Sequence, residues 1–196
     1  MCKLCETKPV YEFTNKRKLC KNCFIKYFQK KVLYTIRRFE MLKRDEVIGY
    51  KRGMDFRNVV LENILEMFAE KWMIKIVELR SQAHDINKQL IDNKRISKVA
   101  IGQSIDLTAY KIINTLINKS AKNFGDVAPT ESKIIKPLYL LLDKEVFLYA
   151  KLKKLKFKEE KSDKDEILTF IDKLEINHPE VKRAIVNGYL ELYNRA

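Results

Sequence analysis

The residues whose spacing most directly predicts chemistry are four cysteines, the only ones in the chain. They lie at the N-terminus in the pattern C-x2-C-x14-C-x2-C, as Cys2, Cys5, Cys20 and Cys23. Two such pairs can bring four thiolates to one tetrahedral Zn²⁺ at about 2.3 Å each, which leaves no open position for a substrate. The pattern therefore predicts a structural zinc ion, with unligated thiols and an iron–sulfur centre as the alternatives.

Strong positive charge accompanies the cysteines. The 196 residues include 40 Lys and Arg against 26 Asp and Glu, a net charge of +14. Residues 1–44 contain 13 of these cations and only three glutamates. Such a surplus favours a polyanionic partner. The cations expected to contact nucleic-acid phosphates are Lys16, Arg17, Lys18, Lys30, Lys31, Arg37 and Arg38. The alternative interpretation is the solvated face of a generally basic protein.

Two N-terminal elements would position these groups. Residues 1–23 combine the cysteines with the strand-like run Val10–Thr14, as expected for a small hairpin. From Phe24 to Lys43, apolar residues recur at helical spacing with basic residues between them, which predicts a basic amphipathic helix. We therefore expect a zinc finger over residues 1–23 and a linking helix over residues 24–44.

The rest of the chain, residues 45–196, reads as one α/β domain. The predicted strands are buried, at Val47–Tyr50, Ile74–Glu78 and Lys98–Ile101, and the helices are Asn58–Lys71 and Leu107–Lys119. Alternation of strand and helix is typical of a parallel sheet. After Pro137 the chain reads as helical, with Ser162 as the N-cap of a late helix. The predicted fold class is thus α/β with a helical C-terminus.

Several protein classes do not fit this sequence. Its apolar runs are far shorter than the roughly 20 residues that span a bilayer, and the first residues lack the apolar core of a secretory signal. We therefore expect a cytoplasmic protein without a membrane partner. Walker and G-x-S-x-G motifs are absent, and the two histidines, His84 and His178, stand far apart. The sequence alone therefore assigns no catalytic residue.

A set of short blocks carries a family resemblance. The blocks are Leu19–Phe24, Val32–Phe39, Ile135–Leu138, Asp143–Val146, Tyr149–Ala150 and His178–Pro179. With them the chain resembles the tRNA-uridine 2-thiolation proteins of the PP-loop ATP-pyrophosphatase superfamily, the TtuA type and its eukaryotic cytosolic counterparts. The resemblance implies a zinc finger and linking helix on a trimmed Rossmann-like core, similar to adenine nucleotide alpha hydrolases. It also implies tRNA as the partner.

The family's phosphate loop, S-G-G-x-D-S, is altered in this chain. The aligned residues are Lys51, Arg52, Gly53, Met54, Asp55 and Phe56, so only Gly53 and Asp55 match. Family members admit ATP phosphates to this loop through small residues and backbone N–H groups at a helix N-terminus. The bulk of Arg52 and Phe56 argues against ordinary ATP binding. Lys51 and Arg52 could still attract a phosphate, and a plain surface loop is the alternative.

A second family block, G-H-N-L-D-D-E-A, corresponds to Gly102–Ala109. Asp106 matches one family acid, but Leu107 and Thr108 replace the next two. The segment Leu79–Ser97 is short and lacks the cysteines that serve iron–sulfur binding or persulfide transfer in the family. A degenerate nucleotide loop comprising Lys51, Arg52, Gly53, Asp55 and Asp106 is therefore expected, without catalytic residues.

Three functional hypotheses follow from these features. The favoured one is a tRNA-binding, non-catalytic member of a thiolation system, acting with an active paralogue or as a homodimer. The second is an active ATP-dependent thiolation enzyme with an unorthodox phosphate loop. The third is a zinc-ribbon regulator that binds nucleic acid, since basic charge alone does not distinguish DNA from RNA.

Overall fold

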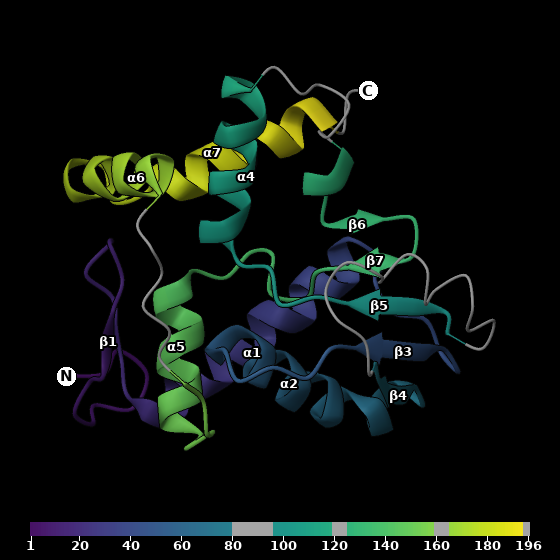
Figure 1. Ribbon diagram of the computed structural model, residues 1–196. Helices are drawn as coiled ribbons and strands as arrows, with labels where there is room; N and C mark the ends of the chain where they lie inside the picture. The colour runs from purple at the N-terminus through teal and green to yellow at the C-terminus, as the bar shows by residue number, and fades with distance from the viewer. Residues whose placement is uncertain (80–95, 119–124, 159–164, 194–196) are drawn as a thin grey trace.

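The computed structural model describes residues 1–79, 96–118, 125–158 and 165–193. Within these ranges the chain forms a small N-terminal hairpin, a long helix and a five-stranded sheet with helices around it (Figure 1). This arrangement confirms the predicted α/β fold class. Several sequence predictions lie outside the described residues: His84, most of the shortened segment Leu79–Ser97, the helix end at Lys119 and the N-cap at Ser162.

The N-terminal hairpin pairs β1 (Tyr11–Glu12) with β2 (Lys18–Leu19) in antiparallel register, Tyr11 opposite Leu19. Lys16 at its tip has a positive φ of 63°, and the Phe13 N–H donates to the carbonyl of Arg17 across the turn. The predicted hairpin is confirmed.

Helix α1 (Lys21–Arg38) begins directly after Cys20 and buries Phe24, Phe28, Val32 and Ile36. These residues recur every four positions, so they share one face of the helix. The helix ends five residues before the predicted Lys43, because Glu40 adopts a φ of 47° and the Met41 N–H donates to the Ile36 carbonyl at 2.9 Å. That turn buries Met41 and directs the chain into the sheet.

The sheet has the strand order β4-β3-β5-β7-β6. Its strands are β3 (Val47–Tyr50), β4 (Lys75–Glu78), β5 (Lys98–Ala100), β6 (Thr130–Glu131) and β7 (Ile134–Ile135). All pairings are parallel except that of β6 with β7. The prediction of a buried second strand was wrong, because β4 lies at an edge with Val77 and Glu78 exposed. The two-residue strands β6 and β7 were missed because so short a run has no periodicity to detect.

Helices pack against one face of the sheet. Helices α1, α2 (Phe56–Trp72) and α5 (Asp143–Leu152) form one core with Ile48, Ala100 and Ile135. Val99 is next to Ala100 in β5, so its side chain points to the opposite face of the sheet. There it packs with Leu79 and Ile96. A third cluster joins α4 (Ile105–Ile117) to α7 (Val181–Tyr193).

The remaining helix, α6 (Glu166–Asn177), contacts both α4 and α7. It begins with Asp165 as N-cap, whose carboxylate accepts from the Ile167 N–H at 2.8 Å. Among the described helices, none combines the length and apolar character that crossing a bilayer demands.

Candidate metal centre and nucleic-acid interface

The four cysteines converge at the base of the hairpin. All four Sγ atoms lie within 4.8 Å of one another, with Cys5 at 3.3 Å from Cys20 and 3.6 Å from Cys23. Cys2 and Cys20 are buried, whereas Cys5 is exposed. The structure therefore assembles the predicted set into one four-sulfur site that could hold a metal ion.

Local backbone geometry explains how each pair presents its sulfurs. After Cys5 the chain turns sharply at Glu6, with a φ of 58°, and the Glu6 N–H donates to the Cys2 carbonyl at 3.0 Å. The second pair lies where α1 starts, and the Cys20 carbonyl accepts the Phe24 N–H at 2.8 Å. One pair is thus carried on a tight turn and the other on a helix N-terminus.

A buried carboxylate, Glu145, ties the linking helix to the body of the protein. Glu145 is fully buried in α5 and accepts from the Tyr27 hydroxyl at 2.9 Å and the Leu142 N–H at 2.9 Å. Lys31 of α1 and Arg183 of α7 form ion pairs with it at 3.1 and 3.2 Å. Helices α1, α5 and α7 therefore meet at one buried carboxylate whose charge is balanced by two cations.

The pKa values follow from this burial. Desolvation alone would raise the pKa of Glu145, but the Lys31 and Arg183 cations outweigh it and hold that pKa below its ordinary value. Desolvation lowers the pKa of Lys31 to about 8, against the opposing effect of Glu145. The sequence offered no sign of this cluster, because Glu145 is 114 residues from Lys31 and 38 residues from Arg183 along the chain.

The structure places the predicted phosphate-binding cations in three environments. Lys16, Lys18, Lys30, Arg37 and Arg38 are exposed. Arg17 is half-buried, with its guanidinium 4.3 Å from the centre of the Phe13 ring. Lys31 differs from the predicted exposed cation, because its side chain is only 16% exposed and forms an ion pair with Glu145.

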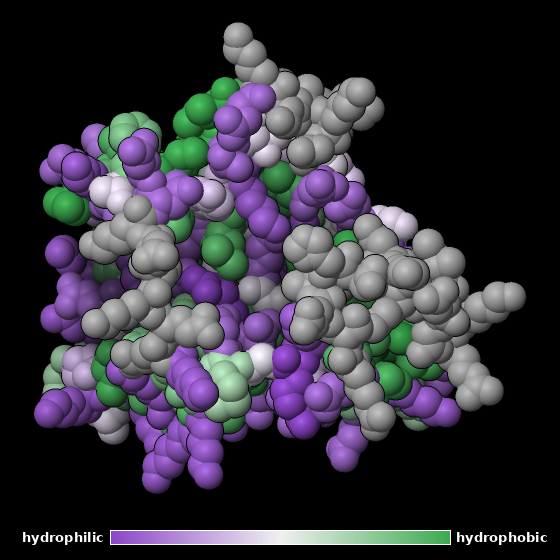
Figure 2. Space-filling view, in the orientation of Figure 1, coloured by the Kyte–Doolittle hydropathy of each residue, from purple (hydrophilic) through white to green (hydrophobic). Residues whose placement is uncertain are grey.

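Three hollows lie along the junction between the finger, α1 and α7. One of about 450 Å³ lies between the finger tip and the start of α7, and one of about 430 Å³ lies between the finger and α1. A third, of about 150 Å³, is lined by Lys31, Arg38 and Arg183, among others. In Figure 2, hydrophilic side chains cover much of the left-hand side, where Figure 1 places the finger.

The altered nucleotide loop lies at the carboxyl ends of β3 and β5. Strand β3 has β4 on one side and β5 on the other, so the order in which strands are added to the sheet reverses at β3. In open α/β sheets such a switch point is where ligands bind. Gly53 and Gly102 meet there: a Cβ on Gly53 would lie 2.7 Å from the Asn58 amide nitrogen, and one on Gly102 would lie 3.1 Å from the Asn58 amide oxygen.

Ion pairs and hydrogen bonds occupy the same switch point. Asp55 caps α2 by accepting the Arg57 N–H at 3.1 Å, so its carboxylate occupies the helix terminus that a phosphate would use. The Arg57 guanidinium pairs with Asp55 at 3.2 Å and, through two nitrogens, with Asp143. Asp106 accepts the Asp143 N–H at 2.7 Å. The matching acids Asp55 and Asp106 are therefore near each other but already engaged.

The bulky residues of the loop turn away from this closure. Arg52 pairs with Glu62 at 2.7 Å and Glu78 at 3.1 Å, and Phe56 packs against Phe147 and Phe157. Contrary to the prediction, Arg52 and Phe56 therefore do not fill the loop; the Asn58 side chain lies against both of its glycines. Lys51 is exposed.

Comparison with solved structures finds a similar fold. No family model matches the sequence, and no curated protein matches it either. The fold is similar to that of a tRNA thiolase. The structure of a U34-tRNA thiolase, NcsA from Methanococcus maripaludis with its [4Fe-4S] cluster, matches this chain with a TM-score of 0.78 at 21% sequence identity. The match covers 100% of this chain and 87% of the thiolase chain.

Proposed function

We propose that this protein is a member of the tRNA thiolation family that binds tRNA through its finger and helix α1. The observation that carries the proposal is the full-length match to a tRNA thiolase fold, in a chain with +14 charge concentrated on the finger and α1. We further propose that it acts in the cytoplasm as a non-catalytic subunit beside an active paralogue or a second copy. In this proposal residues 1–23 are the finger, 24–44 the linking helix and 45–196 the degenerate nucleotide domain.

For the metal, we propose a single zinc ion. Four Zn–S bonds of about 2.3 Å in a tetrahedron place the sulfurs about 3.8 Å apart. The Sγ atoms here, all within 4.8 Å of one another, fit that spacing. A [4Fe–4S] cluster binds each thiolate to a different iron, so its four sulfurs must stand farther apart. The ion would hold the finger in shape and supply no reaction step.

The RNA surface in this proposal consists of the exposed cations of finger and α1. Arg38 lies at the C-terminal end of α1, 5.3 Å from the centre of the Phe39 ring, and its neighbour Arg37 is exposed. Lys30 and Lys26 rim the hollow between finger and α1, whose floor includes Leu19 and Tyr27. Cations beside partly buried rings suit both phosphate contacts and base stacking.

Replacing Arg37 and Arg38 with alanine should weaken tRNA binding and flatten its salt dependence. Each phosphate contact contributes about 0.9 to the slope of log K against log salt on duplex nucleic acid, so the slope should fall by up to about 1.8. Fluorescence anisotropy with labelled bulk tRNA over a range of KCl concentrations measures this slope. Lys71→Ala with Lys75→Ala removes the same charge far from the finger and should leave it unchanged. An unaltered slope in the Arg37/Arg38 variant would contradict this surface.

The non-catalytic part of the proposal rests on the closed switch point. ATP phosphates would need the helix terminus that Asp55 caps and the space that the Asn58 side chain takes between Gly53 and Gly102. They would also meet Asp55, Asp106 and Asp143, whose negative charge is balanced by Arg57 and Lys182 within the protein. Binding would therefore require breaking an ion-pair network and bringing like charges together.

Calorimetric titration with Mg-ATP, with and without bulk tRNA, is expected to show no saturable heat. The same titration of Asn58→Ala serves as the comparison, because this substitution opens the space beside Gly53 and Gly102 without changing the charge. Saturable binding to the unmodified protein would instead favour the alternative of an active thiolation enzyme, which the retained Gly53 and Gly102 at the switch point support.

A further inference from the structure

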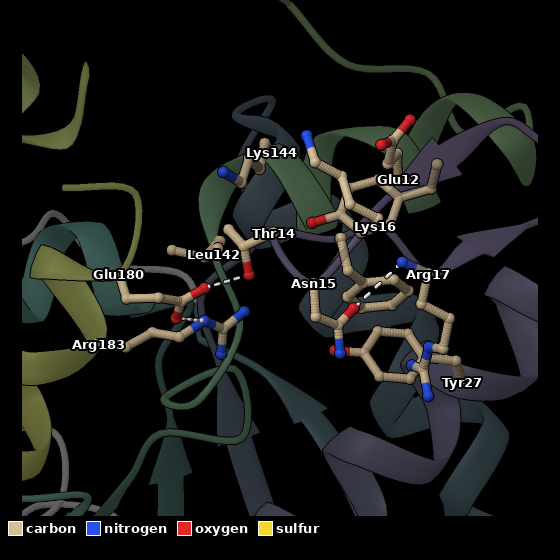
Figure 3. A pocket seen from close by; sticks show the side chains of 12 residues that line it. Glu12, Thr14, Asn15, Lys16, Arg17, Tyr27, Leu142, Lys144, Glu180 and Arg183 are labelled. Carbon is tan, nitrogen blue, oxygen red and sulfur yellow. Dashed lines mark hydrogen bonds and ion pairs between the residues drawn. The ribbon is translucent and has the colours of Figure 1, made fainter. Parts of the chain in front are cut away.

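We propose that the pocket between the finger tip and helix α7 binds one unpaired nucleotide of the RNA, an inference that rests on the proposed function. Figure 3 shows this pocket, with the finger-tip residues on one side and, on the other, Arg183 of α7 and Glu180 just before that helix. Leu142 and Lys144, at the start of α5, complete its wall. Its volume of about 450 Å³ is within the usual range of small-molecule sites.

The aromatic part of the wall offers surfaces for a base. Tyr11, Phe13 and Tyr27 line the pocket and pack edge to face, with ring centres 4.8 Å apart for Tyr11 and Phe13 and 4.9 Å for Phe13 and Tyr27. The planar guanidinium of Arg17 lies over Phe13 and near Tyr27. Splayed-out RNA bases stack on rings and on arginine planes of this kind.

Polar groups on the same wall suit the edge of a base. The Arg17 Nε is buried and has no hydrogen-bond partner among the described residues, a costly state that an acceptor atom of a base would relieve. The Asn15 amide oxygen accepts the backbone N–H of Arg17 at 3.2 Å, which fixes the Asn15 side chain and leaves its NH₂ group to donate. Together they form a donor pair beside a stacking surface.

The charge of the rim suits the phosphate that a nucleotide carries. Lys16, Arg17, Lys144 and Arg183 line the pocket against two carboxylates, Glu12 and Glu180. Lys144 also pairs with Glu175 at 3.3 Å and Arg183 with Glu145 at 3.2 Å, so Lys16 and Arg17 are the cations that the proposal assigns to the phosphate. Both carboxylates are already engaged: Glu12 with Lys18 at 3.2 Å, and Glu180 with the Thr14 hydroxyl at 2.5 Å and Arg183 at 3.2 Å. The Thr14–Glu180 bond also holds the finger tip against α7, which keeps the pocket formed. Lys16 is exposed at the tip.

The test compares two fluorescent RNAs by anisotropy: a short blunt duplex, and the same duplex with a single-stranded 3′ extension of mixed sequence. The extension should raise the affinity of the unmodified protein by about tenfold, the effect of stacking one base. Arg17→Lys keeps the charge but removes the planar stacking group, so the affinities of this variant for the two RNAs should become equal. Lys144→Ala lies outside the finger and should reduce the gain, whereas Lys173→Ala, an equal charge loss on α6, should not.

Two results would overturn the inference while leaving the proposed function standing: equal affinity of the unmodified protein for the two RNAs, or a gain that survives both Arg17→Lys and Lys144→Ala. Failure to bind either RNA would instead refute the proposed function, and the pocket assignment with it.

Discussion

Cys20→Ser is expected to release the metal and unfold the finger, the largest effect of any single substitution in this protein. A structural zinc site in a small domain contributes roughly 10 kcal/mol or more to folding, because the site does not exist in the unfolded chain. The loss should extend into the body, since Leu19 and Cys20 belong to the same buried cluster as Phe24 and Phe28 of α1. Elemental analysis and thermal unfolding measure both effects.

A matched control lies within the same cysteine pair. Asn22 is exposed between Cys20 and Cys23, so Asn22→Ser should retain about one zinc per chain and an unchanged melting temperature. Iron in place of zinc, with visible absorption, would contradict the single-ion assignment. Full metal content and normal folding in Cys20→Ser would refute the four-cysteine site itself.

The second large effect is expected from Glu145→Gln. The amide preserves the shape of the side chain but removes the buried charge that Lys31 and Arg183 share. Breaking a buried ion pair by neutralising one partner costs about 3–5 kcal/mol. Urea denaturation followed by circular dichroism should show a loss of that order in the free energy of unfolding.

Glu180 provides the control for this prediction. It pairs with the same Arg183, but its side chain is 54% exposed, so Glu180→Gln should cost less than about 1 kcal/mol. The contrast separates burial from pairing as the cause of the loss. Equal effects of the two substitutions would show that Glu145 is not the charge on which the junction of α1, α5 and α7 depends.

The cysteine site was predictable from sequence because its geometry is largely local. Each pair spans only four residues, so a tight turn at Glu6 or the first turn of α1 suffices to present two sulfurs on one side. The spacing between the pairs then only requires a hairpin, which β1 and β2 form. The cysteine pattern does not say which metal binds. The distances between the sulfur atoms bear on that choice.

The closed switch point was only half predictable. Motif comparison located Gly53, Asp55 and Asp106, and the sheet order brings them to one edge. It did not reveal Arg57 and Asp143, which pair across 86 positions of sequence. Nor did it reveal that Arg52 turns toward Glu62, because a side chain's direction depends on which partner lies within reach.

The sequence by itself determined the local features: the four-cysteine pattern, the main helices, strands β3 and β5, and the concentration of charge near the N-terminus. Tertiary structure alone decided which of those charges face solvent. Lys30 and Lys31 are neighbours in one basic helix, yet Lys30 is exposed and Lys31 is paired with a buried glutamate from α5. Periodicity shows which residues share a helix face, whereas packing against distant helices decides which face becomes interior.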